Sequence, residues 1–195
     1  MGVRWKFATN TNLNIEAPGT HVENIGFFAE DGTASIYIET DGATRSKGGT
    51  DGSSIYNCAM KGMGIVTNGC NEISIVHCRF QAKYDGTVSS IDMTGSANQI
   101  VRPIIRDCEF IGGNANNMSG PCIVMLAPVY DAVIRDCYFN ADPDGSIYIT
   151  ISSTGNTGII SNCHFGVADV STGRIVEGGL ITTGIYDGGG LATST

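Results

Sequence analysis

The sequence predicts an all-β protein built from stacked coils. Of its 195 residues, 23 are Ile and 12 are Val, but only 4 are Leu. β-Branched residues favour strands, whereas Leu and straight-chain residues favour helices. A six-residue phrase also recurs along the chain, as in repeat proteins whose coils each add the same strands. The length suits one domain with a core of its own.

The recurring phrase places Ile or Val first, Asn, Asp or His third, Cys fourth and an aromatic or Met sixth. It occupies residues 22–27, 55–60, 75–80, 105–110, 134–139 and 160–165, with Ile in place of Cys in the first copy. The fourth positions follow one another at intervals of 33, 20, 30, 29 and 26 residues. Irregular intervals of this size predict a solenoid of about six coils with loops of variable length.

The third residue of each phrase is the predicted corner of its coil. The apolar first and fourth residues would point to opposite faces of a straight strand, so both can face the core only if the chain bends between them. Asn, Asp and His are the side-chain-bearing residues that best tolerate the left-handed conformation of such a bend. The predicted corners are Asn24, Asn57, His77, Asp107, Asp136 and Asn162.

A second apolar strand follows each phrase after a polar loop. The expected strands are Ile36–Ile38, Ile65–Val66, Ile91–Met93, Ile123–Met125, Ile147–Ile149 and Ile175–Val176. The loops between strands contain Asp-Gly turn signals at residues 31–32, 41–42, 51–52, 85–86 and 144–145. Each coil therefore supplies two or three short strands, which stack about 4.8 Å apart on those of the next coil.

The phrase resembles the coil repeat of pectate-lyase-like proteins over residues 22 to about 177. This resemblance implies a single-stranded right-handed parallel β-helix with an Asn corner ladder and stacks of Cys and aromatic residues. The expected organisation is an N-terminal arm or cap over 1–20, the β-helix over 21–177 and a C-terminal tail over 178–195. A β-sandwich or jelly roll is the rival fold, and it would need two-residue hairpins in place of the repeated single-residue corner.

Five of the seven cysteines occupy the fourth position of the phrase, so we expect a ladder of small buried thiols. The spacing matches neither a Cys-x-x-Cys pair nor a zinc site, and no metal or cofactor is predicted. A reduced ladder indicates synthesis in a reducing compartment. Cys70 and Cys122 lie off the ladder and have no assigned role. His21, His77 and His164 fall in different coils, which does not favour a catalytic triad.

The resemblance also implies where an active site would lie, because β-helix lyases use Asp-bound calcium with an Arg base and hydrolases use a pair of carboxylic acids. Asp92 is expected to face outward between inward-facing Ile91 and Met93. The other carboxylates on strands or loops are Glu39, Asp41, Asp51, Asp85, Asp142 and Asp144. Most of these fall in Asp-Gly turns, which need Asp for turn geometry alone. No adjacent pair of acids occurs on a strand, and no catalytic residue is assigned.

Arg106 and Arg135 share one outward position on consecutive coils, so we expect them side by side. Stacked guanidinium groups suit an anionic ligand, but pairing with Asp107, Glu109 and Asp136 is the alternative that we favour. Tyr56 and Tyr138 are also expected to face outward. The other aromatics with a polar group do not form a stripe for stacking sugars; they are Trp5, Tyr37, Tyr84, Tyr130, Tyr148 and Tyr186.

Charge and hydropathy limit the partners. A net charge of −8 argues against nucleic acid. No apolar run reaches the roughly 18 residues that cross a bilayer, so no membrane partner is expected. The first residues lack the apolar stretch of a secretory signal. Disorder is excluded, since 42% of residues are hydrophobic.

The ends of a solenoid expose strand edges and core, which proteins cap or pair with another chain. The low-charge tail carries Ile181, Ile185 and Tyr186, so we expect a homo-oligomer, most simply a cyclic trimer. A short β-helix with buried thiols and an acidic surface resembles modules of bacteriophage structural proteins, such as capsid decoration proteins and tail spikes or fibres.

The sequence therefore predicts a non-enzymatic structural protein of a virus particle, made in the host cytoplasm and contacting a major capsid or tail protein. The alternative function is a carbohydrate-active β-helix: a lyase, a hydrolase or a binder of a surface polysaccharide. That alternative would place the chain in the cytoplasm or outside the cell.

Overall fold

The computed structural model describes residues 3–7, 13–15, 17–29, 35–39, 52–68, 71–81, 89–95, 99–112, 122–140, 149–151, 156–166, 175–176, 180–184, 186–187 and 190–191. Every regular element in these ranges is a β-strand, which confirms the predicted all-β class. The strands form three large sheets and one small one, and all of the pairs in them are parallel except the last.

Sheet A contains the strand that follows each predicted corner. Its strands, in spatial order, are β1 (Val3–Phe7), β4 (Ile25–Ala29), β7 (Ala59–Lys61), β10 (Arg79–Gln81), β14 (Glu109–Ile111), β18 (Tyr138–Asn140), β21 (His164–Phe165), β24 (Tyr186–Asp187) and β25 (Gly190–Leu191). β24 and β25 are the antiparallel pair.

Sheets B and C contain the other two strands of each repeat. Sheet B consists of β2 (Leu13–Ile15), β5 (Ser35–Glu39), β8 (Gly64–Asn68), β11 (Ile91–Gly95), β15 (Ile123–Met125), β19 (Ile149–Ile151) and β22 (Ile175–Val176). Sheet C consists of β3 (His21–Glu23), β6 (Ser54–Tyr56), β9 (Ser74–Val76), β13 (Ile104–Arg106), β17 (Ala132–Arg135), β20 (Gly158–Ser161) and β23 (Ile181–Thr183). The small sheet D pairs β12 (Ile100–Val101) with β16 (Val129–Tyr130).

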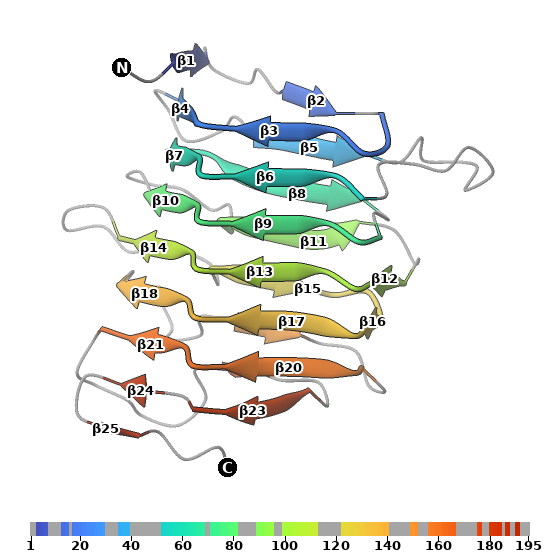
Figure 1. Cartoon of the computed structure of the whole chain (residues 1–195), viewed down its shortest axis with the longest axis vertical. Helices are drawn as coiled ribbons and strands as arrows, with labels where there is room; N and C mark the ends of the chain where they lie inside the picture. The colour runs from blue at the N-terminus through green and yellow to red at the C-terminus, as the bar shows by residue number, and fades with distance from the viewer. Residues whose placement is uncertain are drawn as a thin grey trace.

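The chain visits the large sheets in a fixed rotation. From β3 to β24 it passes from sheet C to sheet A to sheet B and back to C, with β12 and β16 inserted before β13 and β17. Strands at the same position in successive repeats are therefore neighbours, and they stack along the long axis with the chain termini at opposite ends (Figure 1). Three faces of the molecule thus each display a row of equivalent residues.

The predicted corners are confirmed. Asn24, Asn57, His77, Asp107, Asp136 and Asn162 have φ between 49° and 59°, and each separates a strand of sheet C from a strand of sheet A. The corner N–H groups all donate to the carbonyl just before the corner of the next repeat, over 3.0–3.2 Å. Gly184, with φ of 61°, occupies the same place between β23 and β24.

A second ladder of corners lies five residues before the first and was not predicted. Glu72, Arg102 and Asp131 have φ of 55°, 52° and 55°. Glu and Arg are not residues that favour this conformation. Hydrogen bonds to the next repeat hold the left-handed conformation instead. The Glu72 N–H donates to Val101 O, and the Arg102 N–H donates to Tyr130 O, both over 2.7 Å. The Arg102 and Glu72 side chains also form an ion pair.

The core consists of ladders of like residues. Ile55, Ile75, Ile105, Ile134 and Ile160 are fully buried on sheet C. Cys58, Cys78, Cys108, Cys137 and Cys163 are buried just after the corner, and all are free thiols. On sheet A, the Phe80, Phe110, Phe139 and Phe165 rings stack with centroids 4.7–5.1 Å apart. Identical residues stack because each strand sits in register on the one before it.

The predicted second strands all lie in sheet B, as far as the described residues extend. The strand expected at Ile147–Ile149 is β19, Ile149–Ile151, whose Ile149 pairs with Ile123. Residues 147 and 148 lie outside the described part of the chain.

Strands from both ends of the chain extend the sheets. Within the predicted arm, β1 pairs with β4 and β2 with β5. Within the predicted tail, β23 adds to sheet C and β24 to sheet A. The outermost strands at either end of the stack therefore each leave one edge without a partner among the described strands.

Candidate functional site

Asp92 faces outward, as predicted. Its side chain is partly exposed on β11, whereas Ile91 and Met93 on either side are fully buried. The residues that pair with Asp92 on the neighbouring strands are Val66 and Val124. Two carboxylates acting as acid and base must lie within about 5–10 Å of each other. The register of sheet B thus puts no second acid directly beside Asp92.

Asp41, Asp51, Asp85, Asp142 and Asp144 lie outside the described residues, and only the backbone of Glu39 is described, in β5. Tyr37 also has only its backbone described, as does Tyr186, while Tyr84, Tyr148 and Ile185 fall in ranges that are not described.

Arg106 and Arg135 lie side by side, as predicted, because they pair in register between β13 and β17. Each guanidinium group lies near the carboxylate of the next residue, with Arg106 Nη1 3.8 Å from Asp107 Oδ2 and Arg135 Nε 3.6 Å from Asp136 Oδ2. Glu109 instead contacts Arg79, at 3.1 Å. The two arginines thus pair with neighbouring acids, the alternative that we favoured over an anion site.

The histidines lie apart, each with a different neighbour. His77 Nε2 lies 3.5 Å from Asp107 Oδ2 across the corner ladder, and its ring contacts Tyr56 edge to face. The His164 ring makes the same kind of contact with Tyr138. His21 Nδ1 lies 2.6 Å from Ser54 Oγ on the face of sheet C. Tyr56 and Tyr138 are exposed, as predicted.

The buried thiols of the ladder contact one another, and these contacts shift their pKa values in both directions. Contact with the Cys78 thiol, and then burial, raises the pKa of Cys58 far above its ordinary value. Contact with Cys108 is the main cause that raises the pKa of Cys78 to about 12. Cys122 lies apart from the ladder, and burial alone raises its pKa. The raised pKa values keep Cys58, Cys78 and Cys122 protonated near neutral pH, where only a thiolate would react or bind metal. Contact with Cys137 instead lowers the pKa of Cys108 and of Cys163. Cys70 lies outside the described residues.

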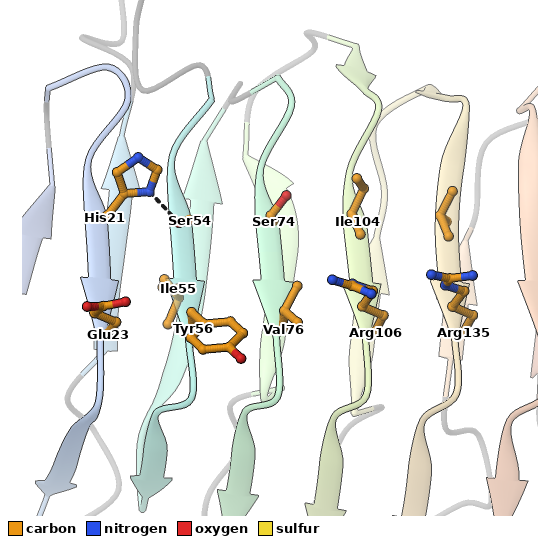
Figure 2. A pocket seen from close by; sticks show the side chains of 11 residues that line it. His21, Glu23, Ser54, Ile55, Tyr56, Ser74, Val76, Ile104, Arg106 and Arg135 are labelled. Atoms are coloured by element: carbon orange, nitrogen blue, oxygen red, sulfur yellow. Dashed lines mark hydrogen bonds between the residues drawn. The ribbon is translucent and has the colours of Figure 1, made fainter. Parts of the chain in front are cut away.

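A shallow groove of about 620 Å³ runs across the outer face of sheet C (Figure 2). Apart from Ile55, the lining residues form two rows that run across the strands of sheet C. The first row is His21, Ser54, Ser74, Ile104 and Val133, and the second row is Glu23, Tyr56, Val76, Arg106 and Arg135. The small side chains of Ser54 and Ser74 leave the hollow between the larger residues at either end.

The His21–Ser54 pair does not have the surroundings of a nucleophile. Acyl transfer requires N–H groups that point at a developing oxyanion. The Ser54 N–H donates to Thr20 O and the Ser74 N–H to Ser53 O, so the sheet itself uses both amides. We therefore interpret this contact as a surface hydrogen bond.

The first row continues beyond the groove as a ridge of β-branched residues. Ile104 pairs with Val133, Val133 with Ile159 and Ile159 with Ile181, so the four occupy one position on four successive strands. Ile181 is 69% exposed, more than any other large apolar side chain in the described part. We call these four residues the apolar ridge. The ridge was not predicted. Ile104, Val133 and Ile159 each stand just before the first residue of a phrase, so aligning the phrases reveals these three, whereas Ile181 precedes no copy of the phrase.

Within the described ranges, no three His, Cys, Asp or Glu side chains are grouped as metal ligands would be. No helix in those ranges has the length and apolar character needed to span a bilayer. Comparison with family models, with curated proteins and with solved structures found no match.

Proposed function

We propose that the chain is a right-handed parallel β-helix of about six coils that works as a rigid structural scaffold. The fixed rotation through sheets C, A and B supports the coil, and the left-handed corner between sheets C and A supports its repetition. The right hand follows the strong preference of parallel strands joined by crossovers. Such a stack resists bending because each coil is hydrogen-bonded to the coils above and below it.

The scaffold forms a homo-oligomer through the outer face of sheet C. The observation that carries this proposal is the apolar ridge, in which Ile181 is exposed and the other three residues are partly exposed. A contiguous apolar row on the surface is a feature of interaction sites. The partner that binds this ridge is a further copy of the same chain. The ridge runs along the direction in which the strands stack. Copies arranged in parallel around a common axis would therefore place the ridge of one chain against the ridge of another along its whole length.

The charges beside the ridge are compatible with this arrangement. Arg106 and Arg135 lie in the adjacent row, and each has a carboxylate of its own chain within 4 Å. Copies packed at the same level would therefore not bring unpaired like charges together. Full burial of an exposed Ile or Val side chain contributes about 1.5–3 kcal/mol. Ile181 would gain most of this, whereas Ile104, Val133 and Ile159 are already partly buried in the single chain and would each gain less. A cyclic trimer is the simplest assembly of this kind.

The setting that we propose is the surface of a virus particle, where the oligomer would contact a major capsid or tail protein. The support for this setting is the resemblance of a short, thiol-containing coil repeat to bacteriophage structural modules. A protein that binds only the assembled shell would stabilise it by mass action. No enzymatic step is proposed, because Asp92 lies between two valines in its sheet.

The test of this proposal is the mass of the native protein in solution, measured by light scattering after size exclusion. Wild type is expected to elute as a trimer of the 20.4 kDa chain at micromolar concentration. Ile159→Asp places a charge in the middle of the ridge and is expected to give a monomer. Ile181→Ser is a milder change at the exposed end and is expected to weaken the assembly.

The matched control is Ile111→Asp, because Ile111 is also partly exposed but lies on the outer face of sheet A. It is expected to leave the trimer intact. Circular dichroism of each variant shows whether the chain has folded. A wild-type monomer, or equal masses for Ile159→Asp and wild type, would sink the subunit contact.

A further inference from the structure

A second groove, on a different face of the molecule, gathers positive charge. It has a volume of about 600 Å³ and lies on the outer face of sheet A, across β1, β4, β7 and β10. The described residues that line it include Arg4, Lys61 and Arg79 but no Asp or Glu. This composition is unusual for a chain with a net charge of −8, in which acidic residues outnumber basic ones by 19 to 11.

The register of sheet A explains the hollow. Along one row of outward positions, Arg4 pairs with Gly26, Gly26 with Ala59 and Ala59 with Arg79. Gly26 and Ala59, the two smallest residues of this row, thus form the floor of the groove between Arg4 and Arg79. A Cβ at Gly26 would lie 3.7 Å from Val3 O and 4.0 Å from Arg4 Cγ, which are ordinary contact distances, so the glycine leaves room for about one more carbon atom.

Phe28, which lies on the neighbouring row of outward positions, contacts two of the cations, Arg4 and Lys61. The Arg4 guanidinium carbon lies 4.7 Å from the centre of the Phe28 ring, and Lys61 Nζ lies 5.9 Å from the same centre. Both distances are within the range of cation–π attraction. One ring therefore positions charges that come from two different strands, β1 and β7, and reduces the entropy that they would lose on binding a ligand.

Arg79 closes the far end of the groove. Its Nε lies 3.1 Å from Glu109 Oε2, outside the groove on β14. Both side chains are well exposed, so this pair contributes little to stability and can exchange for a ligand contact. The amide side chains of Asn24, Asn57 and Gln81 also line the groove, and amides suit the hydroxyl groups of sugars.

We propose that this groove binds an anionic glycan, with a sulfate or phosphate group held between Arg4 and Lys61 above Gly26 and Ala59. A tetrahedral anion presents oxygen atoms in several directions and can accept hydrogen bonds from cations on different strands. The sugar that bears this anionic group would place its hydroxyl groups beside the surrounding amide side chains. The long, uniformly charged backbone of a nucleic acid would also meet the acidic remainder of the surface, which disfavours it. This site goes beyond the proposed scaffold function and does not depend on the subunit contact.

The test measures binding of a sulfated glycan oligosaccharide to the full chain by titration calorimetry at low and high salt. The double variant Arg4→Gln/Lys61→Gln is expected to weaken binding at least tenfold, and wild-type binding is expected to fall as salt rises. Phe28→Leu keeps all the charges but removes the ring, and an intermediate loss is expected. Inorganic phosphate and inorganic sulfate, measured alone, show how much of the affinity the anion supplies.

The matched control is Arg106→Gln/Arg135→Gln, which removes two cations from sheet C and is expected to leave glycan binding unchanged. The unsulfated form of the oligosaccharide is expected not to bind, and a single-stranded oligonucleotide is expected to bind more weakly than the sulfated glycan. Equal loss in both double variants would overturn the proposal, as would stronger binding of the oligonucleotide. Light scattering of Arg4→Gln/Lys61→Gln keeps the two proposals apart, because this variant should retain the mass of wild type.

Discussion

The left-handed corner shows how one residue sets the path of the chain in each repeat. Asn57 bends the chain between β6 and β7, its N–H donates to Val76 O over 3.0 Å, and its side-chain Nδ2 donates to Asn24 Oδ1 over 2.7 Å. A left-handed φ brings Cβ close to the backbone, a cost that Asn, Asp and Gly bear better than other residues. The corner therefore depends on residue identity more than on burial, since Asn57 itself is exposed.

We expect Asn57→Val to destabilise the fold and Asn57→Gly to do so less. Both substitutions remove the amide contact with Asn24, but only Val adds a β-branched side chain at φ of 49°. The difference between the two variants in free energy of unfolding is expected to be about 1–2 kcal/mol, as measured by urea denaturation. Ala59→Val, two residues on in an ordinary strand, is the control and should have little effect. Equal stability of the Val and Gly variants would argue against strain at the corner.

At the scale of the element, each strand is held mainly by its ladder neighbours. Phe110 on β14 stacks on Phe80 at 5.1 Å and on Phe139 at 4.7 Å, with interplanar angles of 6° and 3°. Strands of only three residues make few hydrogen bonds, so the inward ladders supply the packing that keeps them in register. An interior position of a ladder should consequently matter more than a position near its end.

Phe110→Ala is expected to lower the free energy of unfolding by about 3–5 kcal/mol, the usual cost of truncating a buried Phe. Phe165→Ala should cost less, because Phe165 stacks on a single described phenylalanine, Phe139. Tyr138→Ala, on the outer face of β18, is the surface control and is expected to change stability only slightly. Thermal and chemical denaturation measure all three. A larger loss for Phe165→Ala than for Phe110→Ala would contradict the ladder argument.

At the scale of the whole molecule, the three faces differ in chemistry although they share one backbone plan. Sheet C presents the apolar ridge, sheet A presents the cationic groove near the N-terminal end, and sheet B presents Asp92 between valines. A rigid stack keeps such faces at fixed angles to one another. One protein can therefore contact its own copies through one face and a different ligand through another.

The proposed setting predicts where the chain is found in its source. Quantitative mass spectrometry of purified virus particles is expected to detect it at a copy number comparable with that of the major shell protein, because a decoration protein covers the whole shell. A few copies per particle would instead place it in a tail, and the sheet A groove would then be the first surface to test for glycan contact. Absence from the particles would contradict the virion setting.

The residues of the repeat were enough to predict the all-β class, the six corners, the inward Ile, Cys and Phe positions and the outward positions of Asp92, Arg106 and Arg135. These features are local. They follow from the two-residue period of a strand and from the φ that a residue type tolerates, so they can be recognised within one six-residue phrase.

The register between repeats was decided only in the tertiary structure. The second corner at Glu72, Arg102 and Asp131 exists because backbone pairing between repeats outweighs weak local preference. The apolar ridge and the cationic groove exist because residues 20 to 33 positions apart are brought side by side by that pairing, as for Ala59 with Arg79 and Gly26 with Ala59. Loops of irregular length hide this alignment in the sequence, and only the hydrogen bonds between strands of successive repeats establish which outward side chains become neighbours.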